Sequence, residues 1–329
     1  VMLDQILDIL KEKVKHGVVV RIIYDDFGSI NAIPPHFIKE MESIGIQTRR
    51  FNPYKPVLSV IMNDRDHRKI LVVDGRVAHT GGYNIADEYI NKKIRFGYWK
   101  DAGIRVEGEC VNSFTTMFLE MWNYINKDNA VHDEYLNPHN TFSRSEESGF
   151  VLPFCDSPLE HDDVGENLYV SIISRAKKYV YIFTPYLILG TELSHAMISA
   201  ARAGIDVRIV VPKIPDKKLI YLQTKANFRP LIEAGVRIYL YTPGFIHSKC
   251  IVADDDTAIV GTCNLDFRSM YWNFEDFVYM YRTQCIGKIK EDAIETFAVS
   301  EEMDEESTND ISFAGRLLQS ILQLFAPLL

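Results

Sequence analysis

The chain has 329 residues, of which 47% are hydrophobic and 25% charged, and this composition is typical of folded globular proteins, so it excludes a disordered chain. A chain of this length is expected to form two domains. The formal net charge is −9, from 36 Lys and Arg against 45 Asp and Glu, which argues against a general nucleic-acid-binding protein because affinity for that backbone comes mainly from basic side chains.

Helices that alternate with strands are predicted throughout the first half of the chain. Apolar residues at helical spacing predict a helix over 2–16, and Gly17 ends it. Further along, the pattern predicts a strand at 18–24, a helix at 34–43, an extended stretch at 47–51, a strand at 103–106 and a helix at 111–126. The polar residues 127–148, rich in Asn, His, Ser and acidic side chains, are the expected connection to the second half.

The second half repeats this order of elements. A helix at 192–203, a strand at 207–211, a helix at 226–234 and a strand at 236–241 match the first half, and a helix at 166–178 and a strand at 179–185 come before them. The counterparts of these two earlier elements would fall before residue 1, so we expect the sequence to start inside the first lobe. The predicted fold is therefore α/β, with similar lobes at 1–145 and 146–329 in which helices flank a mixed sheet, the first lobe being incomplete at its N-terminus.

Two stretches near the C-terminus differ in character. Residues 301–310 are acidic and are expected to be a solvated loop or helix end, whereas residues 313–329 are apolar and are expected to pack against a lobe rather than to lie on a membrane. No apolar run reaches the roughly 18 residues of a membrane span, and no signal peptide is recognised. The five cysteines lack a CxxC pair and are expected to be free thiols in a reducing compartment.

A long repeat carries the polar residues that suggest chemistry. The run HRKILVVDGRVAHTGGYN at 67–84 shares its frame with HSKCIVADDDTAIVGTCN at 247–264, at a constant offset of 180 residues (247 − 67). This offset maps His67 to His247, Lys69 to Lys249, Asp74 to Asp254 and Asn84 to Asn264. Because chance does not readily keep four polar positions and a glycine in register, we infer two related lobes that each donate one His, one Lys and one Asn to a shared cleft.

The repeated His and Lys suit the chemistry of phosphate esters. Each pair is expected on a strand, where alternate side chains point the same way. An imidazole can act as a nucleophile or carry a proton, and an ammonium group is a compact charge for a phosphoryl oxygen. Two imidazoles opposed across one phosphorus split a slow displacement into two easier ones, with one ring attacking and the other moving the proton. The symmetry of the repeat does not assign these two roles.

The doubled HxK(x4)D pattern with GxxN after it resembles the phospholipase D superfamily. Short sequence segments around it indicate a more specific resemblance. TGGYNIADEY at 80–89, GFIHSK at 244–249, NLDFRS at 264–269 and NFE at 273–275 are similar to bacterial cardiolipin synthases. The resemblance covers nearly the whole chain. It implies two phospholipase D-like lobes with the active site at their interface.

The resemblance also implies which histidine attacks the phosphorus and which one transfers the proton. His67 is the implied nucleophile, and His247 is the implied acid and base. An imidazole that must present one nitrogen usually has the other held by a carboxylate. The implied carboxylates are Asp101 and Glu275, which follow the histidines of their own lobes by 34 and 28 positions (101 − 67 and 275 − 247).

Four further side chains are expected to hold the non-bridging phosphate oxygens, on which negative charge builds up during the reaction. They are Lys69, Lys249, Asn84 and Asn264. Asp74 and Asp254 complete the signature, and the resemblance gives them the structural task of pinning a turn. No metal and no cofactor are expected, since four such donors suffice and no His, Asp and Glu cluster has the spacing of metal ligands.

The expected function is that of a phosphatidyltransferase, which makes cardiolipin and glycerol from two phosphatidylglycerol molecules through a phosphohistidine intermediate. With water as the acceptor the same site would be a phospholipase, and with another alcohol a different phosphatidyltransferase. A nuclease-type phosphodiesterase is disfavoured by the acidic balance, and a non-catalytic lipid-binding protein is disfavoured because both copies keep their His and Lys.

The same reading predicts partners and a location. The expected partners are phosphatidylglycerol, other anionic phospholipids and a membrane surface, and no nucleic acid is expected. The resemblance implies a membrane anchor upstream of residue 1. It places the lobes on the cytoplasmic side of a bacterial cytoplasmic membrane.

Overall fold

Helices and strands alternate along the chain, as the apolar spacing predicts. The computed structural model describes residues 1–53, 64–136, 149–160, 162–306 and 319. The first half contains α1 (Met2–Lys15), β1 (Arg21–Asp25), α2 (Asp26–Ser29), α3 (Phe37–Ser43), β2 (Gln47–Phe51), β3 (Arg65–Asp66), β4 (Leu71–Val73), β5 (Val77–Gly81), β6 (Tyr98–Lys100), β7 (Gly103–Glu107), α4 (Val111–Asn126) and the 3-10 helix η2 (Asp133–Tyr135). The helix expected at 111–126 is confirmed at both of its ends.

The second half is built in the same order and is longer. Its elements are β8 (Phe150–Asp156), α5 (Val164–Arg175), β9 (Tyr179–Phe183), α6 (Thr191–Arg202), β10 (Asp206–Pro212), α7 (Lys218–Ala226), α8 (Phe228–Glu233), β11 (Arg237–Tyr241), β12 (Gly244–Ile246), β13 (Cys250–Ala253), β14 (Thr257–Gly261), α9 (Phe267–Tyr271), β15 (Asn273–Tyr281), α10 (Cys285–Ala298) and β16 (Ser300–Glu302). The helix expected at 226–234 is α8, and the separate helix α7 before it was not predicted.

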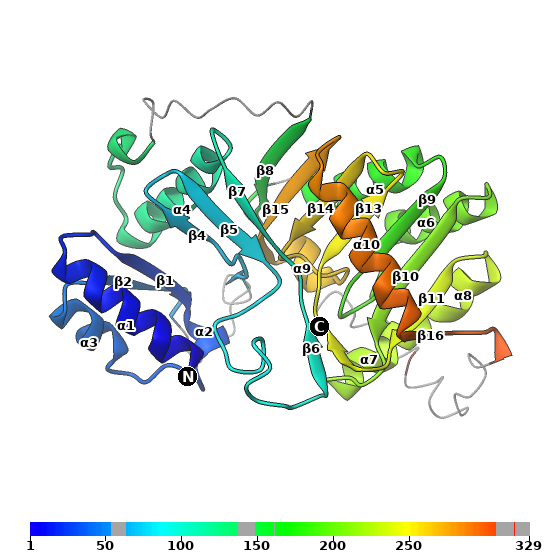
Figure 1. Cartoon of the computed structure of the whole chain (residues 1–329), viewed down its shortest axis with the longest axis horizontal. Coiled ribbons are helices and arrows are strands. Elements are labelled where there is room, and N and C mark those ends of the chain that lie inside the picture. Colours follow the sequence, from blue (N-terminus) through cyan, green and yellow to red (C-terminus); the bar gives the residue numbers. More distant parts are fainter. Residues whose placement is uncertain (54–63, 137–148, 161, 307–318, 320–329) are drawn as a thin grey trace.

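One mixed sheet forms the centre of the second half. Its strands follow the order β16-β11-β10-β9-β13-β14-β15, and β9, β10 and β11 are parallel while the other pairs are antiparallel. Figure 1 shows α10 crossing one face of this sheet. Strand alternation sends Val180 and Ile182 toward α5, α6 and α8, and sends Tyr181 and Phe183 toward α10, so helices cover both faces.

The first half contains the matching strands in two separate sheets. The parallel pair β1-β2 corresponds to β10-β11, and the antiparallel set β4-β5-β7 corresponds to β13-β14-β15. In the second half, β9 lies between β10 and β13, whereas no strand of the described residues lies between β1 and β4. As a result Leu71 and Val73 of β4 are 54% and 47% exposed, whereas their counterparts Ile251 and Ala253 are buried.

The two halves are joined by strand pairs that cross between them. β3 of the first half runs parallel to β15, and β6 runs parallel to β12 of the second half. At the second junction a Cβ on Gly244 would lie 2.3 Å from the backbone N and O of Tyr98, so only glycine allows this close approach. A shared apolar core also crosses the boundary, since Ala78 and Phe114 of the first half belong to one cluster with Val252 of the second.

Near the C-terminus the structure differs from the sequence-based prediction. The acidic stretch 301–310 was expected to be a solvated loop or helix end, but Glu301 and Glu302 belong to β16, which pairs with β11. Glu302 is held there by two hydrogen bonds from the guanidinium of Arg237 (2.7 Å each). The lobe boundary at 145/146 and, apart from Gln319, the apolar tail 313–329 lie outside the described residues.

Two further predictions concern the whole chain. All five cysteines are free thiols, as their spacing indicates. Among the residues that the structure describes, no helix combines the length and the apolar character that crossing a bilayer requires.

Candidate active site

His67 lies directly after β3 and is held from the other half of the molecule. Its backbone N–H donates to the carbonyl of Phe274 (3.0 Å) as β3 runs beside β15. Its ring Nδ1 lies 2.9 and 3.0 Å from the two carboxylate oxygens of Glu275, which is fully buried. The ring itself is 26% exposed. Because the carboxylate occupies Nδ1, Nε2 is the nitrogen left to meet a substrate.

His247, in the second half, is held in the same way by residues of the first half. Its backbone N–H donates to the carbonyl of Lys100 (2.7 Å), at the end of the β6–β12 pair. Its ring Nδ1 lies 2.8 Å from a carboxylate oxygen of Asp101, whose other oxygen accepts from the backbone N–H of Ala102 (2.9 Å). His247 is buried, so this imidazole is less exposed than that of His67.

The carboxylate partners are therefore crossed between the halves. We expected each carboxylate to serve the histidine that precedes it in its own lobe, and this prediction of the pairing is wrong, because Glu275 contacts His67 and Asp101 contacts His247. The reason is the parallel pairing of β3 with β15 and of β6 with β12, which carries each histidine to the carboxylate strand of the other half. The site is consequently complete only where the two halves meet.

The two lysines turn back toward their own histidines. Nζ of Lys69 donates to the carbonyl of His67 (2.6 Å). Nζ of Lys249 donates to the carbonyl of His247 and lies 2.7 Å from its Nδ1. These contacts explain how an HxK spacing brings both side chains to one place even though residues 67–69 and 247–249 lie between strands rather than within one.

Burial decides the charge state of these groups. It lowers the pKa of His67 and of His247 below the usual value, and the charge of Lys249 lowers that of His247 further. Burial also lowers the pKa of Lys249 to about 7. The charge of Lys249 acts on His67 and that of Lys69 acts on His247, so the two motifs lie within electrostatic reach of each other.

The motif asparagines are each bound by a hydroxyl group. The side-chain amide of Asn84 donates to Oη of Tyr89 (2.7 Å), and that of Asn264 donates to Oγ of Ser269 (3.0 Å). Asn84 is exposed, whereas Asn264 is buried. The Oδ1 atom of Asn264 is buried and has no hydrogen-bond partner among the described residues.

The signature aspartates lie apart from the reacting groups. The carboxylate of Asp254 accepts the backbone N–H groups of Lys177, Lys178 and Tyr179 (2.6, 2.8 and 3.1 Å) and so fixes the start of β9. β13 separates it from His247. Asp74 has the same left-handed backbone (φ +54° against +53°), and no bond to its carboxylate is found within the described part of the chain. Asp254 therefore makes the turn-pinning contacts that the resemblance implies for it.

Sequence reasoning missed the residues that surround the carboxylates. Glu275 also accepts from the hydroxyl of Thr262 (2.5 Å) and from the amide of Asn273 (3.1 Å). Its neighbour Asp276 accepts from the hydroxyl of Thr80 (2.5 Å) and from the backbone N–H of Lys69 (3.2 Å). The repeat gave no signal for the threonines, because the offset of 180 residues places Gly82 opposite Thr262 and Val260 opposite Thr80.

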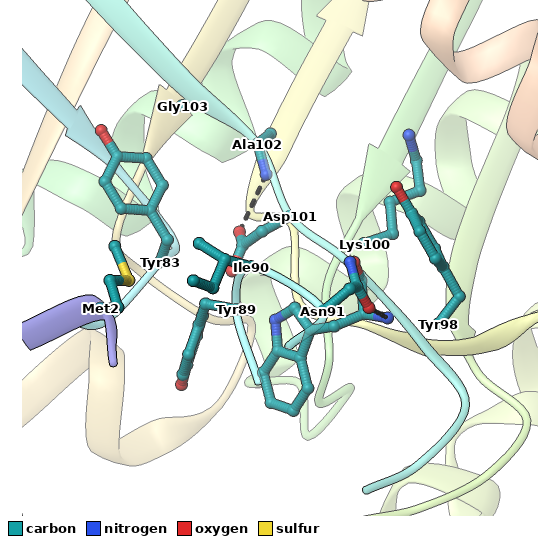
Figure 2. Close-up of a pocket in the computed structure, with 11 residues that line it drawn as sticks. Met2, Tyr83, Tyr89, Ile90, Asn91, Tyr98, Lys100, Asp101, Ala102 and Gly103 are labelled. Atoms are coloured by element: carbon teal, nitrogen blue, oxygen red, sulfur yellow. Dashed lines mark hydrogen bonds between the residues drawn. The ribbon is translucent and has the colours of Figure 1, made fainter. Parts of the chain in front are cut away.

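A pocket of about 410 Å³ opens beside Asp101 in the first half. Figure 2 shows the Asp101 carboxylate, with its bond from Ala102, between Tyr83 and Tyr89 on one side and Lys100 and Tyr98 on the other. The rings of Tyr89 and Trp99, which also line the pocket, lie 5.4 and 5.2 Å from the His247 ring. These aromatic rings shield His247, which is consistent with the lowering of its pKa by burial.

Nowhere in the described ranges do three or more His, Cys, Asp or Glu side chains gather closely enough to hold a metal ion.

Comparison with known proteins places this geometry in a family. A family model described as "Cardiolipin synthase, PLD-like domain" matches residues 3–122 and 169–297. The chain is 47% identical over 328 residues to an uncharacterized protein of Streptococcus mutans, covering 100% of this chain and 70% of that one. It is 38% identical over 327 residues to the cardiolipin synthase of Alkalihalophilus pseudofirmus, covering 99% of this chain and 64% of that one.

The fold has a counterpart among solved structures. The phosphatidylserine synthase of Haemophilus influenzae Rd KW20 superposes with a TM-score of 0.71 at 16% identity, covering 99% of this chain and 84% of that one. At this identity the likeness shows the fold alone. The chain spans 64% of the length of the cardiolipin synthases from Alkalihalophilus pseudofirmus and Geobacillus kaustophilus. The family match over both halves confirms the resemblance drawn from the doubled motif, and the chain belongs to the cardiolipin synthase family of phospholipase D-like proteins.

Proposed function

We propose that the protein containing this chain is a phosphatidyltransferase that makes cardiolipin and glycerol from two phosphatidylglycerol molecules. The observation that carries the proposal is the pair of imidazoles, each held through Nδ1 by a buried carboxylate of the other half and accompanied by its own lysine. The sequence identity of 35–38% to cardiolipin synthases of several bacteria supports this choice of reaction.

The first displacement transfers the phosphatidyl group to the protein. Nε2 of His67 attacks the phosphorus of one phosphatidylglycerol, and the bond from phosphorus to the headgroup oxygen breaks. His247 gives that oxygen a proton, so that free glycerol leaves. An anionic phosphodiester raises the pKa of His247 when it binds, and in this way His247 acquires the proton that it donates, while Nε2 of His67 stays unprotonated for the attack.

The second displacement forms the product. The terminal hydroxyl of another phosphatidylglycerol attacks the phosphohistidine, His247 takes the proton of this hydroxyl, and the bond from phosphorus to His67 breaks. Lys69 and Lys249, with Asn84 and Asn264, stabilise the charge on the non-bridging oxygens in both steps.

The proposal includes the partners and the location. The substrates are phosphatidylglycerol and other anionic phospholipids, reached at the surface of a bacterial cytoplasmic membrane from its cytoplasmic side. The names and bacterial sources of the relatives support this location, as do the five free thiols, which suit a reducing compartment. The division into lobes at 1–145 and 146–329 remains a prediction.

The test uses the full-length protein in mixed micelles with phosphatidylglycerol labelled in its headgroup and acyl chains. We expect cardiolipin and free glycerol from the unchanged protein, and neither product from His67→Ala or His247→Ala. His79→Ala is the matched control, because this histidine lies in β5 within the same repeat and touches none of the reacting groups; it should keep the activity.

The products separate the proposal from its alternatives. Phosphatidic acid in place of cardiolipin would make the site that of a phospholipase. Activity on nucleic-acid diesters but not on lipids would show that the substrate is a nucleic acid. Full activity in His67→Ala would show that His67 is not the nucleophile. A phosphoenzyme that is labile in acid and stable in base, present in the unchanged protein and absent from His67→Ala, is expected for the intermediate.

A further inference from the structure

The two asparagines of the repeated motif have the same kind of partner at the same distance along the chain. Asn84 donates to the hydroxyl of Tyr89, and Asn264 donates to that of Ser269, in both cases five residues later. Tyr89 and Ser269 are themselves separated by the offset of the repeat (269 − 89 = 180). The repeat thus continues beyond the asparagines as an amide–hydroxyl pair, although the side chains that provide the hydroxyl differ.

Each hydroxyl is fixed by its own local structure. The backbone N–H of Ser269 donates to the carboxylate of Asp266 (2.7 Å), which caps α9, and Ser269 is buried. The backbone N–H of Tyr89 donates to the carbonyl of Ala86 (3.2 Å) in a turn that follows Asn84. The backbones of both residues are therefore held at a fixed place near the asparagine amides from which their hydroxyls accept.

Tyr89 makes a second contact that a serine cannot reach. Its ring lies 5.4 Å from that of His247, edge to face at 82°, and 4.5 Å from the ring of Trp99. One side chain of the first half thus touches both the first asparagine and the histidine of the second half. Burial raises the pKa of the Tyr89 phenol, so that the hydroxyl keeps its proton at neutral pH.

A hydrogen bond to one N–H group of a primary amide fixes the direction of the other N–H group. The amide nitrogen carries two N–H groups in one plane. When a fixed hydroxyl accepts one of them, the plane of the amide is set and the second N–H points in one direction only. A donor that is oriented before the substrate arrives stabilises the charge of the transition state without reorganising.

We propose that Tyr89 and Ser269 are positioning residues that set the planes of Asn84 and Asn264 for the phosphate oxygens, and that Tyr89 also holds the ring of His247. The proposal rests on the proposed phosphoryl transfer and adds two residues to its machinery. Asn84 is exposed and can rotate without its hydroxyl, whereas Asn264 is confined by burial. Loss of the hydroxyl should therefore slow the reaction more at Tyr89 than at Ser269.

The experiment is a double-mutant cycle in the full-length protein with Asn84→Ala, Tyr89→Phe and the two combined. Its readout is the release of labelled glycerol, which the first displacement produces whichever acceptor follows. We expect Asn84→Ala to lower kcat about 100-fold and Tyr89→Phe to lower it about tenfold with little change in KM. The double variant should be no slower than Asn84→Ala alone, because the hydroxyl acts through the amide.

Matched controls separate positioning from folding. Tyr98→Phe removes a hydroxyl from the same pocket without touching either asparagine and should leave kcat and the thermal unfolding temperature unchanged. Tyr89→Phe should also unfold at the unchanged temperature. Multiplication of the two losses in the double variant, to about 1,000-fold, or unchanged kcat in Tyr89→Phe, would overturn the proposal.

A second variant tests the contact with His247. This ring faces the carboxylate of Asp101 and the amino group of Lys249, and the charge of Lys69 also reaches it. Tyr89→Leu removes the aromatic cover, so water should raise the pKa of His247, and its limb of the pH–rate profile should move to higher pH, while Tyr89→Phe keeps the profile. An unmoved limb in Tyr89→Leu contradicts this part of the proposal.

A binding measurement keeps the two proposals distinct. In the His67→Ala background no turnover occurs, and the water-soluble phosphodiester glycerophosphoglycerol can be titrated into the same four combinations at residues 84 and 89. If the unchanged protein releases no glycerol, the proposed function fails. Non-additive weakening of glycerophosphoglycerol binding would still support the positioning of the amide, and additive weakening would refute it.

Discussion

At the scale of single residues, the carboxylate that supports each histidine is the feature with the clearest consequence. Burial acts to raise the pKa of Glu275, but the charge of His67 and its hydrogen bond outweigh burial and hold that pKa below the usual value. The carboxylate therefore stays ionised and fixes the tautomer of the ring, with the proton on Nδ1. Burial also acts to raise the pKa of Asp101, but the charges of His247 and Lys249 outweigh burial and hold that pKa below the usual value.

Exchange of one carboxylate for an amide should reveal the crossed pairing. Glu275→Gln keeps the volume and removes the charge, so we expect kcat to fall about 100-fold or more, and Glu295→Gln on the exposed side of α10 to have no effect. In ¹⁵N spectra of the imidazoles, Glu275→Gln should alter the signals of His67 and leave those of His247. Changes in the signals of His247 instead would show that Glu275 supports the histidine of its own half and would contradict the crossed pairing.

The acidity of Lys249 predicts how binding depends on pH. With a pKa of about 7 in the free protein, this amino group is charged below pH 7 and loses its proton as the pH rises through 7, so the anion meets one positive charge fewer at high pH. The affinity for glycerophosphoglycerol in His67→Ala should then fall about tenfold between pH 6 and 8. Titration calorimetry measures this fall, and Lys249→Gln should reduce the slope; an affinity that rises with pH would contradict the assignment.

At the scale of elements, close approach of backbones decides where the site residues can lie. The segment after β5 passes so near β6 that a Cβ on Gly82 would lie 2.2 Å from a carboxylate oxygen of Asp101 and 2.8 Å from the carbonyl oxygen of His247. Gly82, in the sequence GGYN, is thus required because the carboxylate of Asp101, which contacts His247, leaves no room for a side chain. The sequence pattern shows the glycine, but it does not show that Asp101 is the neighbour that excludes a larger residue.

The same substitution at two glycines should have opposite effects. Gly82→Ala forces Asp101 away from His247, and we expect it to lower the free energy of unfolding by about 1–3 kcal/mol and to remove most of the activity. Gly287 lies in α10, where an added Cβ meets nothing within 4 Å, so Gly287→Ala should raise the free energy of unfolding by about 0.5 kcal/mol. Urea denaturation measures both; a neutral Gly82→Ala would contradict the close approach.

At the scale of the whole molecule, one apolar core extends through both halves. It unites Val106 and Phe114 of the first half with Val260 and Val278 of the second. The crossed strand pairs and the carboxylate–histidine contacts lie along the same boundary. Separation of the halves would expose this core and dismantle the site at once, so neither half is expected to stay folded alone.

This shared core predicts that the molecule unfolds in one cooperative step. Phe114→Ala leaves a cavity in the first half, and we expect it to destabilise the protein by about 3–5 kcal/mol. Hydrogen exchange should show β5 and β7 of the first half losing protection together with β9 and β10 of the second. Loss of protection in the first half while β9 and β10 remain protected would show that the halves are independent.

Much of this protein was readable from the sequence because the relevant signals are local or repeated. Apolar spacing predicts α4 and most other helices, and the offset of 180 residues identifies His67, Lys69 and Asn84 together with their counterparts. The exceptions are features that apolar spacing does not report, such as the separate helix α7 before α8 and the pairing that draws Glu301 and Glu302 into β16.

The sequence by itself determined the α/β class, the two-fold repeat and the family, because these follow from composition, periodicity and residue type, and it predicts which side chains react. Only the tertiary structure decided which carboxylate contacts which histidine and which hydroxyl accepts a hydrogen bond from which asparagine. The contacts of His67 with Glu275 and of His247 with Asp101 span 208 and 146 residues. They depend on strands of one half pairing with strands of the other, and no local pattern of residues encodes such a pairing.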